Sequence, residues 1–275
     1  DKIIYKEEPK VEKKVEEKEK KNEKNIFSMK DKDFEELKNY KSNNKQTEVK
    51  INKQKFNLRL WNSCGYCVAD LEDPKAPQLL YDFCKKKGYF IKLLINNAGY
   101  ALPGAFHETS MVDEEKFLRV LGISVIAITK LFLKDMIAVR EGKIMMISSV
   151  AAFSPQSSIQ TLYGPIKTFV NRFSEGLNLS YNKKGISSTA VCPGYTATNF
   201  HSTSGVQEEM DRVPSFMKTT ATRVAEEAVV AMLKEKRVYV PTKTFKVIVF
   251  LLKVLPHSLF PLFSKRLAPG RYEKN

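Results

Sequence analysis

Residues 142–149 read GKIMMISS. The stretch holds a short apolar run that begins after a glycine and ends at two serines. Such a run between turn-forming residues is typical of a strand buried on both faces, and strands of that kind occur in parallel sheets. Parallel strands need long connections, which are usually helices. The stretch therefore predicts the centre of an α/β fold if helical segments lie on either side of it.

Helical and strand-like segments alternate on both sides of this stretch. Helical periodicity covers roughly 114–139 before it and 161–182 after it. Two further helices are predicted over 77–88, with Gly88 as the expected C-cap, and over 222–236. Three more apolar runs are typical of strands: KLLINN (92–97), GISSTAVCPG (185–194) and RVYVP (237–241). The alternation predicts an α/β fold with a parallel sheet and helices on both faces.

The composition favours a globular protein with a basic surface. The 275 residues are 43% hydrophobic, which is enough for a core, and they carry a formal net charge of +15. A basic surface suits nucleic acid, an anionic membrane or an anionic cofactor, and it is also typical of a lysine-rich proteome. No run of basic residues interleaves with aromatics as in nucleic-acid modules. We therefore expect a small-molecule substrate and no nucleic-acid partner.

The first 50 residues differ from the rest of the chain. Residues 1–50 are rich in Lys, Glu and Asn and hold too few apolar side chains to offset the entropy of ordering them. They are predicted to be a charged, disordered leader, and acidic residues nearly balance the lysines there. Residues 56–243 are predicted to form the folded domain, and 244–275 an apolar C-terminal segment.

The cysteines and histidines argue against a metal site. Cys64 and Cys67 form a C-x-x-C pair, but the chain has only four cysteines and three histidines, and no second pair completes a zinc site. We therefore predict no metal. The scattered cysteines and the lack of a recognisable signal peptide predict a reduced, cytoplasmic setting.

A tyrosine and a lysine stand four residues apart near the start of the helix predicted over 161–182. The sequence LYGPIK (162–167) places Tyr163 and Lys167 on one face of a helical turn. An ammonium close to a phenol lowers the pKa of the phenol, so such a pair can exchange a proton near neutral pH. The same spacing is common on ordinary surface helices, so the pair gains meaning only from its neighbours.

Three predicted strand ends supply those neighbours. Ligands of parallel α/β sheets bind beyond the carboxyl ends of the strands. The three segments are therefore expected to open on one crevice, with the start of the Tyr163 helix beside it. The segments are Asn96-Asn97-Ala98-Gly99, Ser148-Ser149 and Cys192-Pro193-Gly194-Tyr195-Thr196-Ala197-Thr198.

Four motifs occur in order along the chain: VADLEDP (68–74), LINNAG (94–99), ISS followed by YGPIK, and PGYTAT (193–198). Together they resemble the short-chain dehydrogenase/reductase family of nicotinamide-dependent oxidoreductases, and the resemblance covers roughly residues 68–240. It implies a Rossmann-like sheet and hydride transfer between NAD or NADP, with NADP slightly favoured, and the carbonyl or hydroxyl group of a hydrophobic substrate. It also implies a homodimer through the long helices.

The resemblance assigns the catalytic roles. Tyr163 would protonate the carbonyl oxygen as hydride arrives, and Lys167 would lower the pKa of Tyr163 and bind the nicotinamide ribose. Ser149 would hold the substrate oxygen, with Ser148 as the alternative. Hydroxyl donors aimed at an oxygen on which alkoxide charge develops lower the barrier to reaction.

The resemblance also implies the cofactor contacts. They comprise Asp70 and Leu71 at the adenine, the backbone of Asn97, Ala98 and Gly99 alongside, Tyr163 and Lys167 themselves, and Pro193, Gly194, Thr196 and Thr198 at the nicotinamide.

One feature of the family is missing at its usual place. The family's first strand runs into a glycine-rich turn whose amides hold the pyrophosphate, whereas the first glycine here is Gly65. Charge-assisted hydrogen bonds contribute about 1.5–3 kcal/mol each, so losing this turn weakens cofactor binding. A catalytically impaired relic or binding protein is therefore the alternative to an enzyme. FNLRLW (56–61) alternates apolar and polar residues and is the candidate for one substitute strand.

Two smaller departures concern the helices. The family commonly has an asparagine at the position of Leu121, so a water-linked proton relay through that side chain is not expected here. Pro165 lacks an amide donor and is compatible with its helix only if the helix begins close to Tyr163.

The C-terminal stretch FKVIVFLLKVLPHSLFPLF (245–263) is strongly apolar. Two lysines and two prolines interrupt it, whereas a membrane span needs about 20 consecutive apolar residues. It is predicted to be a lid over the substrate pocket or a helix in a membrane interface, with Lys246 and Lys253 snorkelling to the headgroups. The second interpretation adds peripheral membrane contact to the cytoplasmic setting.

Overall fold

The computed structural model describes residues 47–51, 54–58, 67–154, 160–198, 211 and 213–254. The chain forms two compact units, and the second, residues 50–55 and 65–275, holds every element from α3 onward. Apart from these, β1 (Thr47–Ile51) and β2 (Gln54–Leu58) form a two-stranded sheet. β1 includes the last residues of the predicted leader, and β2 overlaps the predicted strand over 56–61. The other residues of both ranges lie outside the described residues.

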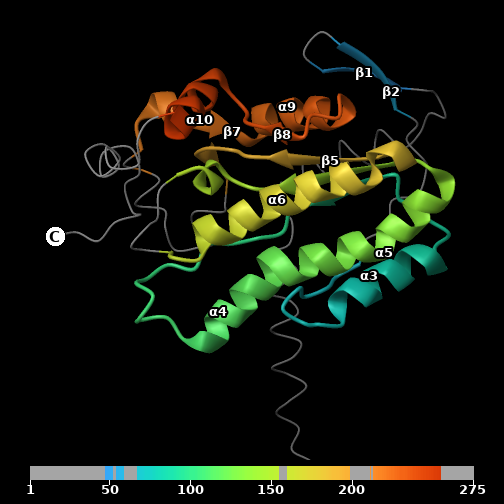
Figure 1. Ribbon diagram of the computed structural model, residues 1–275, viewed down its shortest axis with the longest axis horizontal. Helices are drawn as coiled ribbons and strands as arrows, with labels where there is room; N and C mark the ends of the chain where they lie inside the picture. The colour runs from blue at the N-terminus through green and yellow to red at the C-terminus, as the bar shows by residue number, and fades with distance from the viewer. Residues whose placement is uncertain are drawn as a thin grey trace, which may run out of the picture. The chain divides into compact units, whose positions relative to one another are not determined.

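A four-stranded parallel sheet forms the centre of the second unit (Figure 1). The strand order is β3-β4-β5-β8, and each neighbouring pair runs parallel. All four strands lie within the runs predicted from the sequence. The predicted α/β fold is confirmed. The strands are β3 (Leu93–Asn96), β4 (Gly142–Ile147), β5 (Ile186–Val191) and β8 (Val238–Tyr239).

Helices cover both faces of the sheet. Figure 1 shows α3, α5 and α6 on one side, and α9 and α10 on the other. The bounds of these helices are α3 (Ala76–Lys86), α5 (Ser124–Val139), α6 (Tyr163–Tyr181), α9 (Ala221–Leu233) and α10 (Lys243–Val254). The shorter elements are α4 (Met111–Leu118), η2 (Arg119–Ile123), η3 (Val150–Ala152), η4 (Asn182–Lys184), η5 (Ser215–Met217), β6 (Thr196–Ala197) and β7 (Thr219–Thr220).

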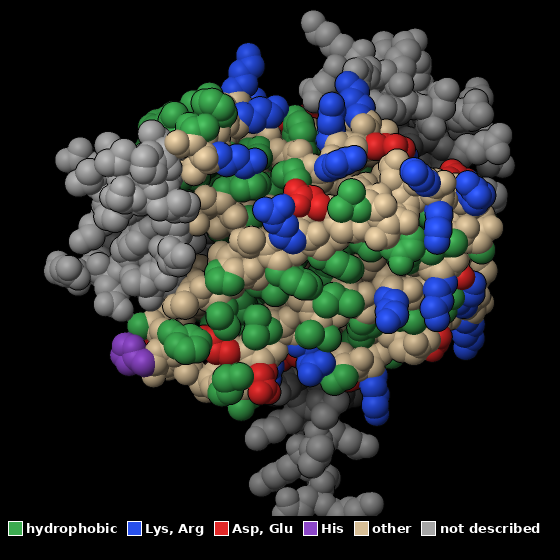
Figure 2. All heavy atoms as spheres, viewed as in Figure 1, with side chains coloured by type: hydrophobic (Ala, Val, Ile, Leu, Met, Phe, Trp, Pro, Cys, Tyr) green, Lys and Arg blue, Asp and Glu red, His purple; other side chains and the backbone are tan. Residues whose placement is uncertain are grey.

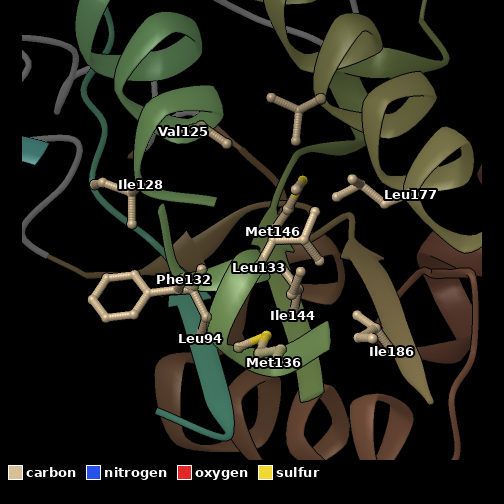
Figure 3. Close-up of a cluster of buried hydrophobic side chains, with 11 residues drawn as sticks. Leu94, Val125, Ile128, Phe132, Leu133, Met136, Ile144, Met146, Leu177 and Ile186 are labelled. Carbon is tan, nitrogen blue, oxygen red and sulfur yellow. The ribbon is translucent and has the colours of Figure 1, made fainter. Parts of the chain in front are cut away.

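The apolar run of β4 supplies the core on both faces of the sheet. Successive side chains of a strand point to opposite faces. Ile144 and Met146 are fully buried in the cluster beneath α5 and α6, which Figure 3 shows together with Leu94 and Ile186. Met145 joins a second cluster with residues of α9. The continuous apolar pattern of GKIMMISS thus results from burial on two sides.

The long helix predicted over 114–139 is built in three parts. α4 begins at Met111 because the Ser110 hydroxyl caps it, accepting a hydrogen bond from the Asp113 amide at 3.1 Å. The predicted start at Glu114 was therefore too late. The five residues of η2 then form a π-helical segment before α5 ends at the predicted Val139.

Gly122 in the π-helical segment allows α6 to pack closely. A Cβ atom at this position would lie 2.8 Å from Cδ1 of Ile166. Real Cβ contacts are longer, so the end of the Ile166 side chain would have to move to admit a larger residue. The contact helps to hold the start of α6 beside η2.

Within the described ranges, no helix combines the length and apolar character needed to span a bilayer. The part of the predicted segment beyond Val254 lies outside these ranges.

Two leucines offer a matched test of this packing. Leu133 on α5 is 7% exposed and belongs to the cluster in Figure 3, whereas Leu179 on α6 is 79% exposed. Leu133→Ala is expected to lower the free energy of unfolding by about 2–5 kcal/mol, because it leaves a cavity. Leu179→Ala should change it by less than about 0.5 kcal/mol. Urea unfolding measures both, and equal losses would contradict the packing described here.

Candidate active site

The ends of β4 and β5 are joined by backbone hydrogen bonds. The Ser148 amide donates to the Val191 carbonyl at 2.7 Å, and the Val150 amide donates to the Pro193 carbonyl at 3.0 Å. β3 lies beside β4 with Asn96 opposite Met146. The structure therefore brings the three predicted strand ends to one edge of the sheet.

The start of α6 is fixed at this same edge. α6 begins at Tyr163, so Pro165 falls in the first turn, where helical amides have no intrahelical acceptor. The helix thus begins close to Tyr163, as the presence of Pro165 requires. The Ser148 hydroxyl donates to the Lys167 carbonyl at 2.9 Å, which ties the helix to the end of β4.

Lys167 is buried although it carries an amine. Its side chain lies on the inner face of α6, and the residue is only 6% exposed. Nζ donates a hydrogen bond to the Ile147 carbonyl at 2.9 Å and lies 5.6 Å from the centre of the Tyr163 ring. Burial lowers the pKa of Lys167 to about 8. The structure therefore brings the predicted Lys167 and Tyr163 pair together, with the amine between the end of β4 and the tyrosine ring.

The two serines at the end of β4 have different environments. Ser148 is 3% exposed, and its hydroxyl is already used by Lys167. Ser149 is only partly buried, and its Oγ accepts a hydrogen bond from the Ala151 amide at 3.1 Å. A hydroxyl that accepts through oxygen can still donate its proton. Ser149 is therefore the better placed of the two to hold a substrate oxygen.

Two buried residues beside Lys167 were missed in the sequence. Cys192 follows β5 and is fully buried, and its thiol donates to Oδ1 of Asn171 at 3.4 Å. Burial raises the pKa of Cys192 to about 11, so the thiol stays neutral beside the amine. For Cys192, the only signal in the sequence was its position at a strand end. Asn171 gave no signal, because it lies eight residues after Tyr163 within an ordinary helical pattern.

The segment after Cys192 depends on Gly194. A Cβ atom there would lie 2.1 Å from the Phe245 ring of α10, so only glycine fits. Thr196 donates its hydroxyl to the Gly194 carbonyl at 3.0 Å and begins β6, which pairs with β7. Thr198 lies exposed just beyond. Four of the predicted contact residues, Pro193, Gly194, Thr196 and Thr198, thus lie along one segment next to the end of β4.

A cavity lies on the other side of β4, next to the end of β3. Its volume is about 360 Å³, and Leu71, Asn97 and Ala98 are among its lining residues, together with side chains of α3 and α5. Asp70 is not among them, because it lies exposed in a turn where its carboxylate accepts a hydrogen bond from the Glu72 amide at 2.9 Å. The structure thus places Leu71 with the NNAG segment and leaves Asp70 at the surface.

Comparisons with known proteins identify the family of this chain. A family model for short chain dehydrogenases matches residues 38–209, which is more than half of the chain. The chain belongs to the short-chain dehydrogenase/reductase family. The resemblance inferred from the four sequence motifs is confirmed.

Relatives and solved structures extend this result. The oxidoreductase UcpA of Escherichia coli (strain K12) is 33% identical over 135 residues, which cover 49% of this chain and 51% of UcpA. The very-long-chain 3-oxoacyl-CoA reductase of Anas platyrhynchos is 36% identical over 138 residues, which cover 49% of this chain and 41% of that protein. The chain thus matches about half the length of these relatives.

A solved short-chain dehydrogenase from Sphingobium yanoikuyae, in complex with NADPH, superposes with a TM-score of 0.58. The match covers 68% of this chain and 74% of that one, at 23% identity. This likeness supports the Rossmann-like fold.

One position of this family member differs in chemistry from the family pattern. Leu121, where the family commonly has an asparagine, is 2% exposed in the π-helical segment η2. A Cβ atom on Gly99 would lie 3.5 Å from its Cγ, an ordinary contact distance, so packing within the protein does not itself require glycine at 99. Leucine has no polar side-chain atom, so this chain has no proton relay through position 121.

The residues present fit one part of a nicotinamide dinucleotide. A buried amine and two hydroxyl-bearing segments lie at the carboxyl edge of the sheet, where the reactive end of such a cofactor binds. The apolar cavity runs along β3 from Ile91 to Ala98 and reaches this edge only at its Asn97 and Ala98 end. The pyrophosphate needs several backbone amides at a glycine-rich turn, and the described residues before α3 contain no glycine. The fit therefore covers the nicotinamide and ribose end.

The buried amine predicts a pH-dependent stability. Because the pKa of Lys167 is about 8 in the folded chain and 10.5 as its ordinary value, the unfolded chain binds more protons between these two values. The free energy of unfolding should therefore rise by about 0.5 kcal/mol between about pH 7 and 8.5, because the raised pKa of Cys192, whose ordinary value is 9.0, opposes part of the rise. Urea unfolding at both pH values measures the rise.

Lys167→Met is expected to abolish the rise, because it removes the titrating group. Lys134→Met, at an exposed position of α5, is the matched control and should keep it. A rise that persists in Lys167→Met would show that another group titrates.

Proposed function

We propose that this chain carries the carbonyl-protonating site of an NAD(P)-dependent short-chain oxidoreductase. The observation that carries the proposal is the buried Lys167 amine, held between the end of β4 and Tyr163. Burying an amine costs free energy, so a buried amine needs a compensating role. Groups with strongly shifted pKa values are concentrated at functional sites. The reaction class follows from the family to which the chain belongs.

In this proposal Tyr163 is the proton donor. When bound, the reduced nicotinamide supplies a hydride to the carbonyl carbon. The Tyr163 hydroxyl gives its proton to the carbonyl oxygen, and the Ser149 hydroxyl donates a hydrogen bond to the same oxygen. Both donors act where negative charge develops, so they stabilise the transition state more than the bound ketone. The reverse reaction oxidises a hydroxyl group through the same atoms.

Lys167 acts on the tyrosine and on the cofactor. Its amine lies 5.6 Å from the centre of the Tyr163 ring, and in its charged form it stabilises the phenolate left after proton transfer. We infer that it also binds the hydroxyl groups of the nicotinamide ribose. Asn97 and Ala98 beside the cavity, and the segment from Pro193 to Thr198, would border the bound cofactor.

The substrate is proposed to be hydrophobic. The inner face of α10 packs on the Gly194 segment and groups with Val150 and Tyr195, so apolar side chains cover this side of the site. The name of the Anas platyrhynchos relative refers to a long-chain acyl group, which agrees in kind. A cytoplasmic setting and a homodimer through the long helices complete the proposal.

A second candidate is a binding protein that keeps the fold but not the reaction. Two observations favour it, namely Leu121 at the asparagine position and the absence of any glycine before Gly65. Losing two charge-assisted hydrogen bonds to the pyrophosphate would cost about 3–6 kcal/mol, which weakens affinity by roughly 10² to 10⁴.

Cofactor titration separates the two candidates. NADPH and NADH are added to the full chain up to millimolar concentration, and nicotinamide fluorescence is recorded. The enzyme candidate predicts saturable binding of at least one cofactor. Absence of binding at millimolar cofactor would exclude the enzyme candidate for this polypeptide.

A substitution of Tyr163 tests its role in the reaction. Tyr163→Phe is expected to lower turnover of a hydrophobic ketone by roughly 10²–10⁴-fold, because it removes the proton donor. The dissociation constant for NADPH should change little. Tyr181→Phe at the far end of α6 is the control with the same chemical change and should retain full turnover. Equal turnover in both variants would remove Tyr163 from this role.

A further inference from the structure

α10 carries apolar side chains on two opposite faces. Its inner face contributes Phe245 and Val249, both buried, to the core. The outer face holds a second set with helical spacing, which we name the outer stripe: Val247, Phe250, Leu251 and Val254, which are 59%, 62%, 43% and 56% exposed. A surface helix needs only one apolar face, and a helix that is apolar all round is normally covered on both. The outer stripe therefore lacks a cover within the described part of the chain.

The outer stripe is held in a fixed orientation. Oε2 of Glu227 on α9 accepts hydrogen bonds from the Thr242 amide at 3.0 Å and from the Tyr239 hydroxyl at 3.1 Å. That hydroxyl in turn accepts a hydrogen bond from Nζ of Lys246 at 3.2 Å. Phe245 is locked on Gly194. Turning the outer stripe toward the core would break these contacts. They therefore fix which face of α10 points away from the described core.

The charges of α10 are all of one sign. Lys243, Lys246 and Lys253 are exposed, and the helix has no acidic residue. Figure 2 shows hydrophobic side chains at the upper left, where α10 lies in Figure 1, with Lys and Arg side chains beside them. A second copy of the chain in a two-fold contact would bring these lysines against one another, which is unfavourable. Anionic phosphates, by contrast, complement them.

We propose that α10 docks on the surface of an anionic lipid bilayer. The helix lies in the interface plane and the outer stripe enters the acyl boundary. Lys243 reaches the lipid phosphates, while Lys246 at Tyr239 and Lys253, whose Nζ lies 4.8 Å from the centre of the Phe153 ring, add positive charge beside the headgroups. The proposal stands on α10 alone and does not rest on the proposed function.

Docking places the candidate site beside the bilayer. The inner face of α10 contacts Gly194, and its cluster includes Val150, the residue after Ser149. A hydrophobic substrate dissolved in the membrane would then reach the site across one helix.

Vesicle flotation of the full chain tests the docking. Vesicles of phosphatidylcholine and phosphatidylglycerol in equal parts are expected to carry the chain upward, and vesicles of phosphatidylcholine alone to carry much less. Phe250→Asp should weaken partitioning by at least about tenfold, because it puts a charge into the acyl boundary. Phe106→Asp makes the same change at a ring that is 54% exposed, on the loop before α4, and should leave partitioning unchanged.

A charge exchange tests the role of the lysines. Lys243→Glu combined with Lys253→Glu should abolish flotation with anionic vesicles. Lys130→Glu combined with Lys134→Glu, on exposed positions of α5, changes the net charge by the same amount and should reduce flotation far less. Thermal unfolding of each variant confirms that it is folded, as expected for exposed positions.

Three results would overturn the proposal. The first is a native chain that stays at the bottom with anionic vesicles. The second is flotation that survives Phe250→Asp, which would assign lipid binding to another part of the chain. The third is a concentration-dependent dimer that Phe250→Asp dissociates without any effect on flotation, which would make a second copy the cover of the outer stripe.

Discussion

The hydrogen bond from the Ser148 hydroxyl to the Lys167 carbonyl joins the start of α6 to the end of β4. The rest of the site depends on this junction. It brings the Lys167 amine to the Ile147 carbonyl, and α6 then carries Tyr163 to the edge at which the strands end. The helix has little freedom there, because Ile166 packs against Gly122 and the buried Cys192 thiol donates a hydrogen bond to Asn171. A buried polar network of this kind fixes geometry as long as each member has a partner.

The parts of the fold that follow from local chemistry were predictable from the sequence. The apolar run of GKIMMISS predicts a strand buried on two faces, and Ile144 and Met145 lie in core clusters on opposite sides of it. Gly88 was expected to cap its helix, and it adopts the left-handed conformation, with φ of 69°, just after α3. The convergence of the strand ends followed from the parallel topology. The position of Lys167 followed from its spacing to Tyr163 and from the strand before it.

Other features depend on contacts between distant segments and gave no local signal. The π-helical segment η2 interrupts a pattern that is periodic throughout, at the place where Ile166 of α6 packs against Gly122. The burial of Cys192 and Asn171 arises only when β5 and α6 meet. Asp70 lies at the surface, away from the cavity that Leu71 lines, since a turn bends its carboxylate back to the Glu72 amide. The outer stripe of α10 likewise appears only once the inner face of the same apolar helix is packed.

The central claim is that a phenol and a hydroxyl from separate segments act on one oxygen at the edge of the sheet. A crystal structure of the chain that resolves the side-chain oxygens tests it most directly. The account predicts that the Tyr163 hydroxyl and Oγ of Ser149 face the same side, with one point lying about 2.6–3.2 Å from both. Side chains of Tyr163 and Ser149 directed to opposite sides of the molecule would contradict it.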